Sequence, residues 1–119
     1  MTDSNIQTAV ALWIDNNSAA IAEYGHIKNW DVSRVTSMRV LFHRTKFNDD
    51  ISRWDVSRVI DMFAMFGVCR NFNQDLSAWN VSSVTSFSWM FSFTVKFNQD
   101  LSNWDVSSAT SLSRMFKES

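Results

Sequence analysis

The feature that most constrains the fold of this chain is a tryptophan that returns at nearly constant spacing. Intervals of 24, 25 and 25 residues separate Trp30, Trp54, Trp79 and Trp104. Neighbouring residues fall into columns: an acidic or amide residue and a valine follow each tryptophan, and a phenylalanine–asparagine pair precedes each of the last three. Such a period is typical of repeat architectures, in which each unit buries its apolar face against its neighbours.

Each repeat changes its hydrophobic period halfway along. The segment "LSAWNVS" alternates apolar and polar residues, which favours a short strand. In "SSVTSFSWMF" the apolar residues Val84, Phe87, Met90 and Phe91 are spaced as on one face of a short helix, with Ser82 or Ser83 as its N-cap. The pattern predicts an α/β fold, a right-handed solenoid of four strand–helix repeats whose strands stack into a parallel sheet.

The N-terminal segment lies outside the repeat and predicts a helical cap. The pattern predicts two short helices: "SNIQTAVALWIDNN", with Ser4 and Gln7 as a capping box, and "SAAIAEYG", with Ser18 as N-cap. Gly25 is expected to end the second helix. Residues 1–26 are therefore interpreted as a cap and residues 27–119 as the four-repeat solenoid, together one continuous domain.

Composition excludes several classes of protein. A chain of 119 residues, 45% of them hydrophobic, suffices for one domain. Its net charge of -1 and pI of about 6.0 indicate no nucleic-acid partner. No apolar run is long enough for membrane insertion. The N-terminus lacks the pattern of a secretory signal. Either the protein stays inside the cell, or a leader lies outside this sequence.

Candidates for catalysis are few. A nucleophile could come from Cys69, and a base from His26 or His43. Cys69 and His43 fall in the variable loops of adjacent repeats, where we expect two unrelated surface residues, and no column supplies a third group or an oxyanion site. We therefore expect no enzyme, no catalytic residue and no cofactor.

Repeated polar columns raise two further alternatives, calcium binding and ice binding. Aspartates recur before and after the tryptophans, but calcium coils normally pair them with glycines that these columns lack. We expect the aspartates to cap turns instead, and the Asn48, Asn73 and Asn98 column to form an internal ladder. The threonine column that suggests ice binding contains Thr36, Thr85 and Thr110 but is interrupted by Ile60.

Large apolar residues at positions predicted to face outward form a candidate contact patch. At about 100° per residue, Trp89 points away from the core face of its predicted helix. The candidate patch consists of Val40, Phe63, Trp89 and Phe93. Because clusters of large apolar side chains on a protein surface often mark a contact site, we expect a protein partner. The alternative is that Trp89 merely packs over the neighbouring helix.

The last repeat suggests a second contact. Its predicted strand, residues 101–106, has no following repeat in this sequence, and "KES" is too short to cover it. The exposed edge would consist of Leu101, Trp104, Leu112, Met115 and Phe116. Open edges pair with other chains, so we expect a two-fold homodimer through this edge, with fraying of the last helix as the alternative.

The columns resemble a known tandem repeat. From Tyr24 to Phe116 the chain is similar to the pattern "FNQDLSxWDVSSVTxMxxMF" of the BspA-like, mycoplasma-lipoprotein-type surface proteins, relatives of the leucine-rich repeats. Phe87 and Leu112 depart from it, because methionine is usual at these positions. The resemblance implies a leucine-rich-repeat-like solenoid used for adhesion or protein contact, often at the cell surface, with no catalytic residues.

Together these observations predict a non-catalytic repeat module for protein–protein interaction, adhesion or assembly. The alternatives are a purely structural piece of a longer repeat array, and a calcium-binding or ice-binding solenoid. No metal site is expected in the preferred interpretation.

Overall fold

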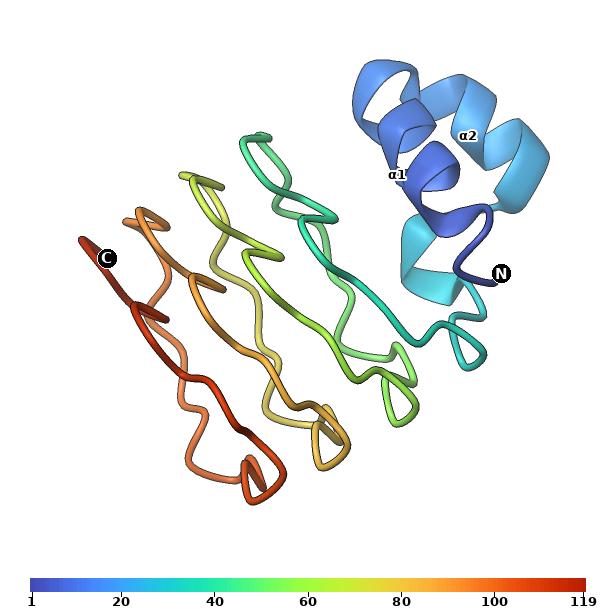
Figure 1. Ribbon diagram of the computed structural model, residues 1–119. Coiled ribbons are helices and arrows are strands. Elements are labelled where there is room, and N and C mark those ends of the chain that lie inside the picture. The colour runs from blue at the N-terminus through green and yellow to red at the C-terminus, as the bar shows by residue number, and fades with distance from the viewer.

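The computed structural model describes residues 1–119, and its helices are confined to the N-terminal part of the chain. These are α1 (Ile6–Asp15), α2 (Asn17–Tyr24) and a 3-10 helix, η1 (Ile27–Asn29). The rest of the chain winds into coils that stack side by side, with the helices at one end and the C-terminus at the other (Figure 1). No helix is both long and apolar enough to cross a lipid bilayer.

The predicted fold class, an α/β solenoid of strand–helix repeats like the leucine-rich repeats, is wrong. After η1 the chain contains no helix and no sheet. Strand-like pairing is limited to isolated parallel bridges, one between each pair of adjacent coils, which link Ser37, Asp61, Ser86 and Ser111. The repeats instead form four coils built from turns, which we number coil 1 (27–50), coil 2 (51–75), coil 3 (76–100) and coil 4 (101–119).

Overlapping turns replace the predicted helix of each repeat. We call these turns the turn ribbon; it covers residues 38–46, 62–71, 87–96 and 112–119. The amide of Leu41 donates to the carbonyl of Met38 (3.2 Å), whereas the next amide, that of Phe42, donates to Met65 in the following coil (2.8 Å). Because alternate amides bond to the neighbouring coil, the uninterrupted local hydrogen bonding of an α-helix cannot form.

Backbone dihedral angles also exclude a helix in the turn ribbon. Eight residues other than glycine have φ between 51 and 61°: Val40, Arg44, Ala64, Val68, Trp89, Phe93, Arg114 and Glu118. They occupy the same two columns in every coil. Each such residue costs about 1–2 kcal/mol, which the hydrogen bonds between coils offset. The predicted core spacing is still met, since Val84, Phe87, Met90 and Phe91 are all buried.

Two turns break up the predicted strand. In "LSAWNVS" the amide of Trp79 donates to the carbonyl of Leu76 (3.1 Å), and the amide of Ser82 donates to Asn80 Oδ1 (3.1 Å). Short polar side chains of this kind compete with extended pairing by bonding to nearby backbone. The alternating apolar residues Leu76, Trp79 and Val81 are nevertheless buried.

Phenylalanine rings form the regular columns of the core. Stacked rings with centroids 5.5, 5.6 and 5.5 Å apart run through Phe42, Phe66, Phe91 and Phe116. A second column contains Phe47, Phe72 and Phe97, with centroids 6.0 and 5.8 Å apart. Because identical rings recur at the same place in each coil, the core of 31 buried residues is continuous from α1 to coil 4.

The tryptophans and asparagines link the coils through polar atoms. The buried indoles of Trp54, Trp79 and Trp104 each donate to a carbonyl of the preceding coil, at 2.8, 3.0 and 3.0 Å. The predicted asparagine ladder is present, since Asn73 and Asn98 each donate a backbone amide to the asparagine side chain of the preceding coil (2.9 Å). It lies on the surface rather than inside the core.

The two predicted N-terminal helices are confirmed, but not all of their predicted caps. Gly25 ends α2 with a φ of 79°, as expected. Ser4 and Gln7 form no capping box, because α1 has no side-chain cap at its N-terminus. Asn16 rather than Ser18 caps α2, accepting from the amide of Ala19 (3.1 Å).

Candidate functional site

A hollow of about 240 Å³ opens between the turn ribbons of the first three coils. We call it the aromatic hollow; its lining consists of His43, Arg44, Phe63, Ala64, Val68, Trp89, Ser92 and Phe93. All three coils contribute, so the stacking of the repeats creates this site.

Small residues in coil 2 leave the space. Ala64 is buried, and its column carries Trp89 in coil 3. Gly67 lies close by, and a Cβ added to it would meet the ring of His43 at 2.9 Å and the carbonyl of Trp89 at 3.3 Å. The missing side-chain volume therefore lets the imidazole of His43 pack against coil 2.

Three residues of the predicted contact patch meet in the aromatic hollow. Phe63, Trp89 and Phe93 all line it and are partly exposed. Val40, the fourth, is 41% exposed but is not part of the lining. The structure thus brings together the aromatic members of the patch, while the valine lies outside.

Cations cover the aromatic rings, a feature that the sequence interpretation missed. The guanidinium of Arg39 lies 4.0 Å from the ring centroid of Phe63. Arg114 and Lys117 lie 5.1 and 5.7 Å from the ring of Trp89. The sequence contains a sign of these contacts. Arg39 occupies the same repeat position as Phe63 in the next coil, and Arg114 occupies the same repeat position as Trp89 in the preceding coil.

His43 contributes the one imidazole ring that lines the aromatic hollow. Burial, and secondarily the charge of Arg44, lowers the pKa of His43. The neutral ring is therefore the dominant form at neutral pH. No carboxylate lines the hollow to orient this ring.

Cys69 is not the surface-loop residue that the sequence suggested. Its side chain is fully buried, with Sγ 3.3 Å from the carbonyl oxygen of Phe47 and 3.7 Å from Thr45 Oγ1. Burial raises the pKa of the Cys69 thiol. The thiol therefore stays protonated and packs as a small apolar group.

The repeated aspartates serve as turn caps. Asp31 and Asp55 each accept from the amide (3.0 Å) and hydroxyl (2.6 Å) of the serine two residues later. Bonding to these serines lowers the pKa of both aspartates. No group of three or more histidine, cysteine, aspartate or glutamate side chains is close enough to hold a metal ion.

The threonines considered for ice binding bond to their neighbours in the stack. Thr85 Oγ1 donates to the carbonyl of Ile60 (3.1 Å), and Thr110 Oγ1 donates to the carbonyl of Thr85 (3.2 Å). Their hydroxyl donors therefore join one coil to the next.

The predicted edge residues of coil 4 divide into two groups. Trp104 and Met115 are buried, and Leu101 is partly buried. Leu112 and Phe116 are 47% and 51% exposed, although Phe116 stacks on Phe91. No strand forms over residues 101–106, so the predicted strand edge is also wrong.

The edge of coil 4 is instead an outward row of amides. Four amides in coil 3 donate to carbonyls of coil 4, for example that of Trp89 to Ser113 (3.1 Å). The amides at the corresponding positions of coil 4 donate no hydrogen bond: Leu112, Arg114, Phe116 and Glu118. A two-fold contact would place this donor row against itself, so the polarity of the row disfavours that arrangement.

A comparison with known families finds one match. The model of a family described as "Mycoplasma protein of unknown function, DUF285" matches residues 13–119. A search of curated proteins and a search of solved structures each found no match.

Proposed function

Because the chain belongs to the DUF285 family, a family of unknown function, we propose a function from its surface: a non-catalytic module that binds other proteins. The observation that carries the proposal is the aromatic hollow. Phe63, Trp89 and Phe93 keep part of their surface exposed around a concave site, and aromatic residues in such sites dominate the energetics of protein contacts. The hollow accommodates one bulky apolar side chain of a partner.

The chemistry of the hollow supports a binding role over catalysis. Its lining has one imidazole and one hydroxyl, His43 and Ser92, with no carboxylate to complete a catalytic triad. The single thiol, Cys69, is buried and protonated. These groups provide shape and hydrogen bonding but no activated nucleophile.

Adhesion or assembly at a cell surface is the finer form of this proposal. Its support is the resemblance of the repeat to that of the BspA-like surface proteins, over Tyr24 to Phe116. A purely structural role within a longer repeat array is the competing proposal, and it requires no ligand in the aromatic hollow.

A peptide-display selection on the folded protein tests the proposal. The test variant is Trp89→Asn, because asparagine tolerates the left-handed backbone at this position, where φ is 61°. The matched control is Ile60→Asn, since Ile60 is 51% exposed and lies outside the hollow. We expect selected peptides to bind about tenfold or more weakly to Trp89→Asn and unchanged to the control.

Two results would overturn the proposal. One is a selection that yields no peptide whose binding depends on Trp89. The other is a large fall in melting temperature for Trp89→Asn, which would identify Trp89 as part of the core and support the structural alternative.

As a second candidate, we propose that the edge of coil 4 associates with another chain. The unpaired amides of Leu112, Arg114 and Phe116 favour a partner that presents carbonyl oxygens. Because a two-fold contact would set this donor row against itself, a second copy would have to present carbonyl oxygens from another part of its surface. Light scattering at two concentrations tests this form of self-association. Leu112→Lys should lower the apparent mass and Ile60→Lys should not, because both residues are exposed but only Leu112 lies at this edge. A monomer at every concentration would exclude self-association.

A further inference from the structure

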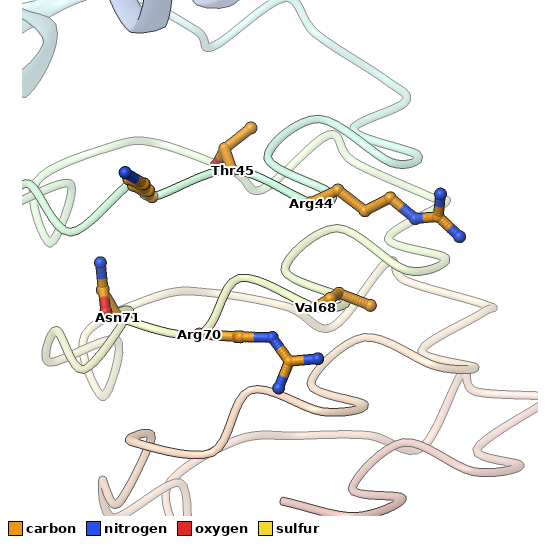
Figure 2. Close-up of a pocket in the computed structure, with 6 residues that line it drawn as sticks. Arg44, Thr45, Val68, Arg70 and Asn71 are labelled. Atoms are coloured by element: carbon orange, nitrogen blue, oxygen red, sulfur yellow. The ribbon is translucent and has the colours of Figure 1, made fainter.

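A second hollow continues the aromatic hollow along the turn ribbon. It has a volume of about 390 Å³ and lies between coils 1 and 2. We call it the cationic hollow; its lining consists of Arg44, Thr45, Lys46, Val68, Arg70 and Asn71. Arg44 and Val68 line both hollows. Figure 2 shows Arg44 and Arg70 extending from neighbouring coils with Val68 between them.

The cations of this second hollow have no acidic partner within the protein. The one ion pair in the structure joins Arg39 and Asp61, at 3.6 Å. Arg44, Lys46 and Arg70 are all exposed. Their charges are therefore available to a ligand.

Charge is segregated over the whole molecule even though the net charge is only -1. Of the 11 lysines and arginines, seven lie on the turn ribbon: Arg39, Arg44, Lys46, Arg70, Lys96, Arg114 and Lys117. Of the 12 acidic residues, only Glu118 lies there. Six of the other acidic residues each accept a hydrogen bond from the amide of the serine two residues later, outside the turn ribbon: Asp31, Asp50, Asp55, Asp75, Asp100 and Asp105. The turn ribbon therefore forms a cationic strip on an otherwise acidic protein.

We infer that the partner of the turn ribbon is an acidic peptide segment, whose bulky apolar residue enters the aromatic hollow and whose carboxylates bind Arg44, Lys46 and Arg70. This inference rests on the proposed protein-binding function and adds the chemistry of the partner. The aromatic and cationic hollows adjoin, so one short extended segment reaches both. Arginine binds carboxylates through paired, charge-assisted hydrogen bonds, which suits the two guanidinium groups of the cationic hollow.

The covered aromatic rings favour a peptide over a nucleic acid. Single-stranded nucleic acids bind aromatic side chains by stacking bases on their faces. Arg39 already lies over Phe63, and Arg114 and Lys117 lie over Trp89. The remaining space suits one apolar side chain, whereas a row of stacked bases would require several free ring faces.

Fluorescence anisotropy with designed peptides tests the inference. The probe is a labelled peptide in which one leucine is flanked by glutamates, and the comparison peptide has glutamine in place of every glutamate. We expect the acidic peptide to bind about tenfold or more tightly and its binding to weaken as salt rises. Equal binding of the two peptides would overturn the inference while leaving the proposed function intact.

Matched charge reversals locate the binding site. The test variant is Arg44→Asp with Arg70→Glu, aspartate being chosen because Arg44 has a φ of 61°. The control is Arg53→Glu with Arg58→Glu, which removes the same charge from exposed residues outside both hollows. We expect binding to fall about tenfold or more in the test variant and by less than about threefold in the control.

Other outcomes are equally decisive. An equal loss in both charge variants would show that binding depends on total charge and would overturn the assigned site. Tighter binding of a single-stranded oligonucleotide than of the acidic peptide, lost on charge reversal, would identify a polyanion as the ligand instead. If the double variant melts below the wild type, Arg70→Glu alone provides the same comparison, because Arg70 has no left-handed backbone.

Discussion

At the end of the stack covered by α1, side chains complete the hydrogen bonds of coil 1, whereas at the outer edge of coil 4 the corresponding groups are unpaired. Asp3 Oδ1 accepts from the amide of Thr36 (2.7 Å), and Gln7 Nε2 donates to the carbonyl of Arg39 (3.0 Å). No group of the chain accepts from the amides of Leu112 and Arg114.

This difference shows that the backbone groups at the edge of a coil are satisfied only where another coil or the N-terminal cap lies against them. In later coils the amides of Ile60 and Thr85 donate to carbonyls of the preceding coil, at 2.7 and 2.8 Å. Asp3 supplies a carboxylate oxygen where a preceding coil would have supplied a carbonyl. The cap thus copies the hydrogen bonding of a coil with side chains, and it adds apolar cover through Ile6, Val10 and Trp13.

The largest expected effect contrasts an inner and an outer tryptophan. Trp79 is 4% exposed and lies between two coils, so Trp79→Ala should lower the free energy of unfolding by about 3–5 kcal/mol. Trp104 is 9% exposed and lies in coil 4, so Trp104→Ala should lower the free energy of unfolding by only about 1–3 kcal/mol. Denaturant unfolding measures both. A cost below about 1 kcal/mol for Trp79→Ala would contradict its core position.

A smaller effect is expected from removing the polar part of the cap. Asp3→Ala leaves the amides of Thr36 and Ser37 without this acceptor and should cost about 1–2 kcal/mol, as the loss of a helix N-cap does. Asp15→Ala is the control, because Asp15 is exposed and forms no ion pair. Equal melting temperatures for wild type and Asp3→Ala would show that apolar contacts alone hold the cap.

Acid should weaken the capped end through the same carboxylate. Bonding to Thr36 lowers the pKa of Asp3 in the folded state. A lowered folded pKa adds stability that is present above the unfolded value of about 3.9 and is lost as pH falls through the folded pKa. Because the site is exposed, we expect less than about 1 kcal/mol.

Unfolding measured from pH 6 down to pH 2 tests this expectation, at about one-unit intervals. Asp3→Asn should flatten the acid limb of the stability curve, since it removes the titrating group. An unchanged acid limb in Asp3→Asn would assign the pH dependence to the serine-capped aspartates of the later turns, such as Asp50 and Asp55, whose pKa values are also lowered.

The smallest effect is expected at the open edge. Met62 and Leu112 share a column, but Met62 is fully buried and Leu112 is 47% exposed. Leu112→Ala should cost less than about 0.5 kcal/mol, against about 2–5 kcal/mol for Met62→Ala. Hydrogen exchange provides a second measure, with the amide of Leu112 exchanging faster than that of Met62. Similar costs and exchange rates would show that the edge of coil 4 is covered in solution.

The sequence alone determined which residues lie inside. The columns of tryptophan, valine and phenylalanine identify most of the buried positions in coils 1 to 3, because stacking requires only that equivalent residues recur at a fixed period. The aspartate–serine turns and the two N-terminal helices were also predictable, since both depend on residues close together in the sequence.

The conformation of the repeat and the character of its surface depend instead on contacts between coils. A helix and a row of turns both space apolar residues as Val84 and Phe87 are spaced, so the pattern could not separate them. Hydrogen bonds to the neighbouring coil decided for turns. The same stacking placed Arg39 over Phe63 and joined Arg44 to Arg70 in one hollow. Each of these contacts joins residues of two different coils. The sequence of a single repeat therefore could not predict them.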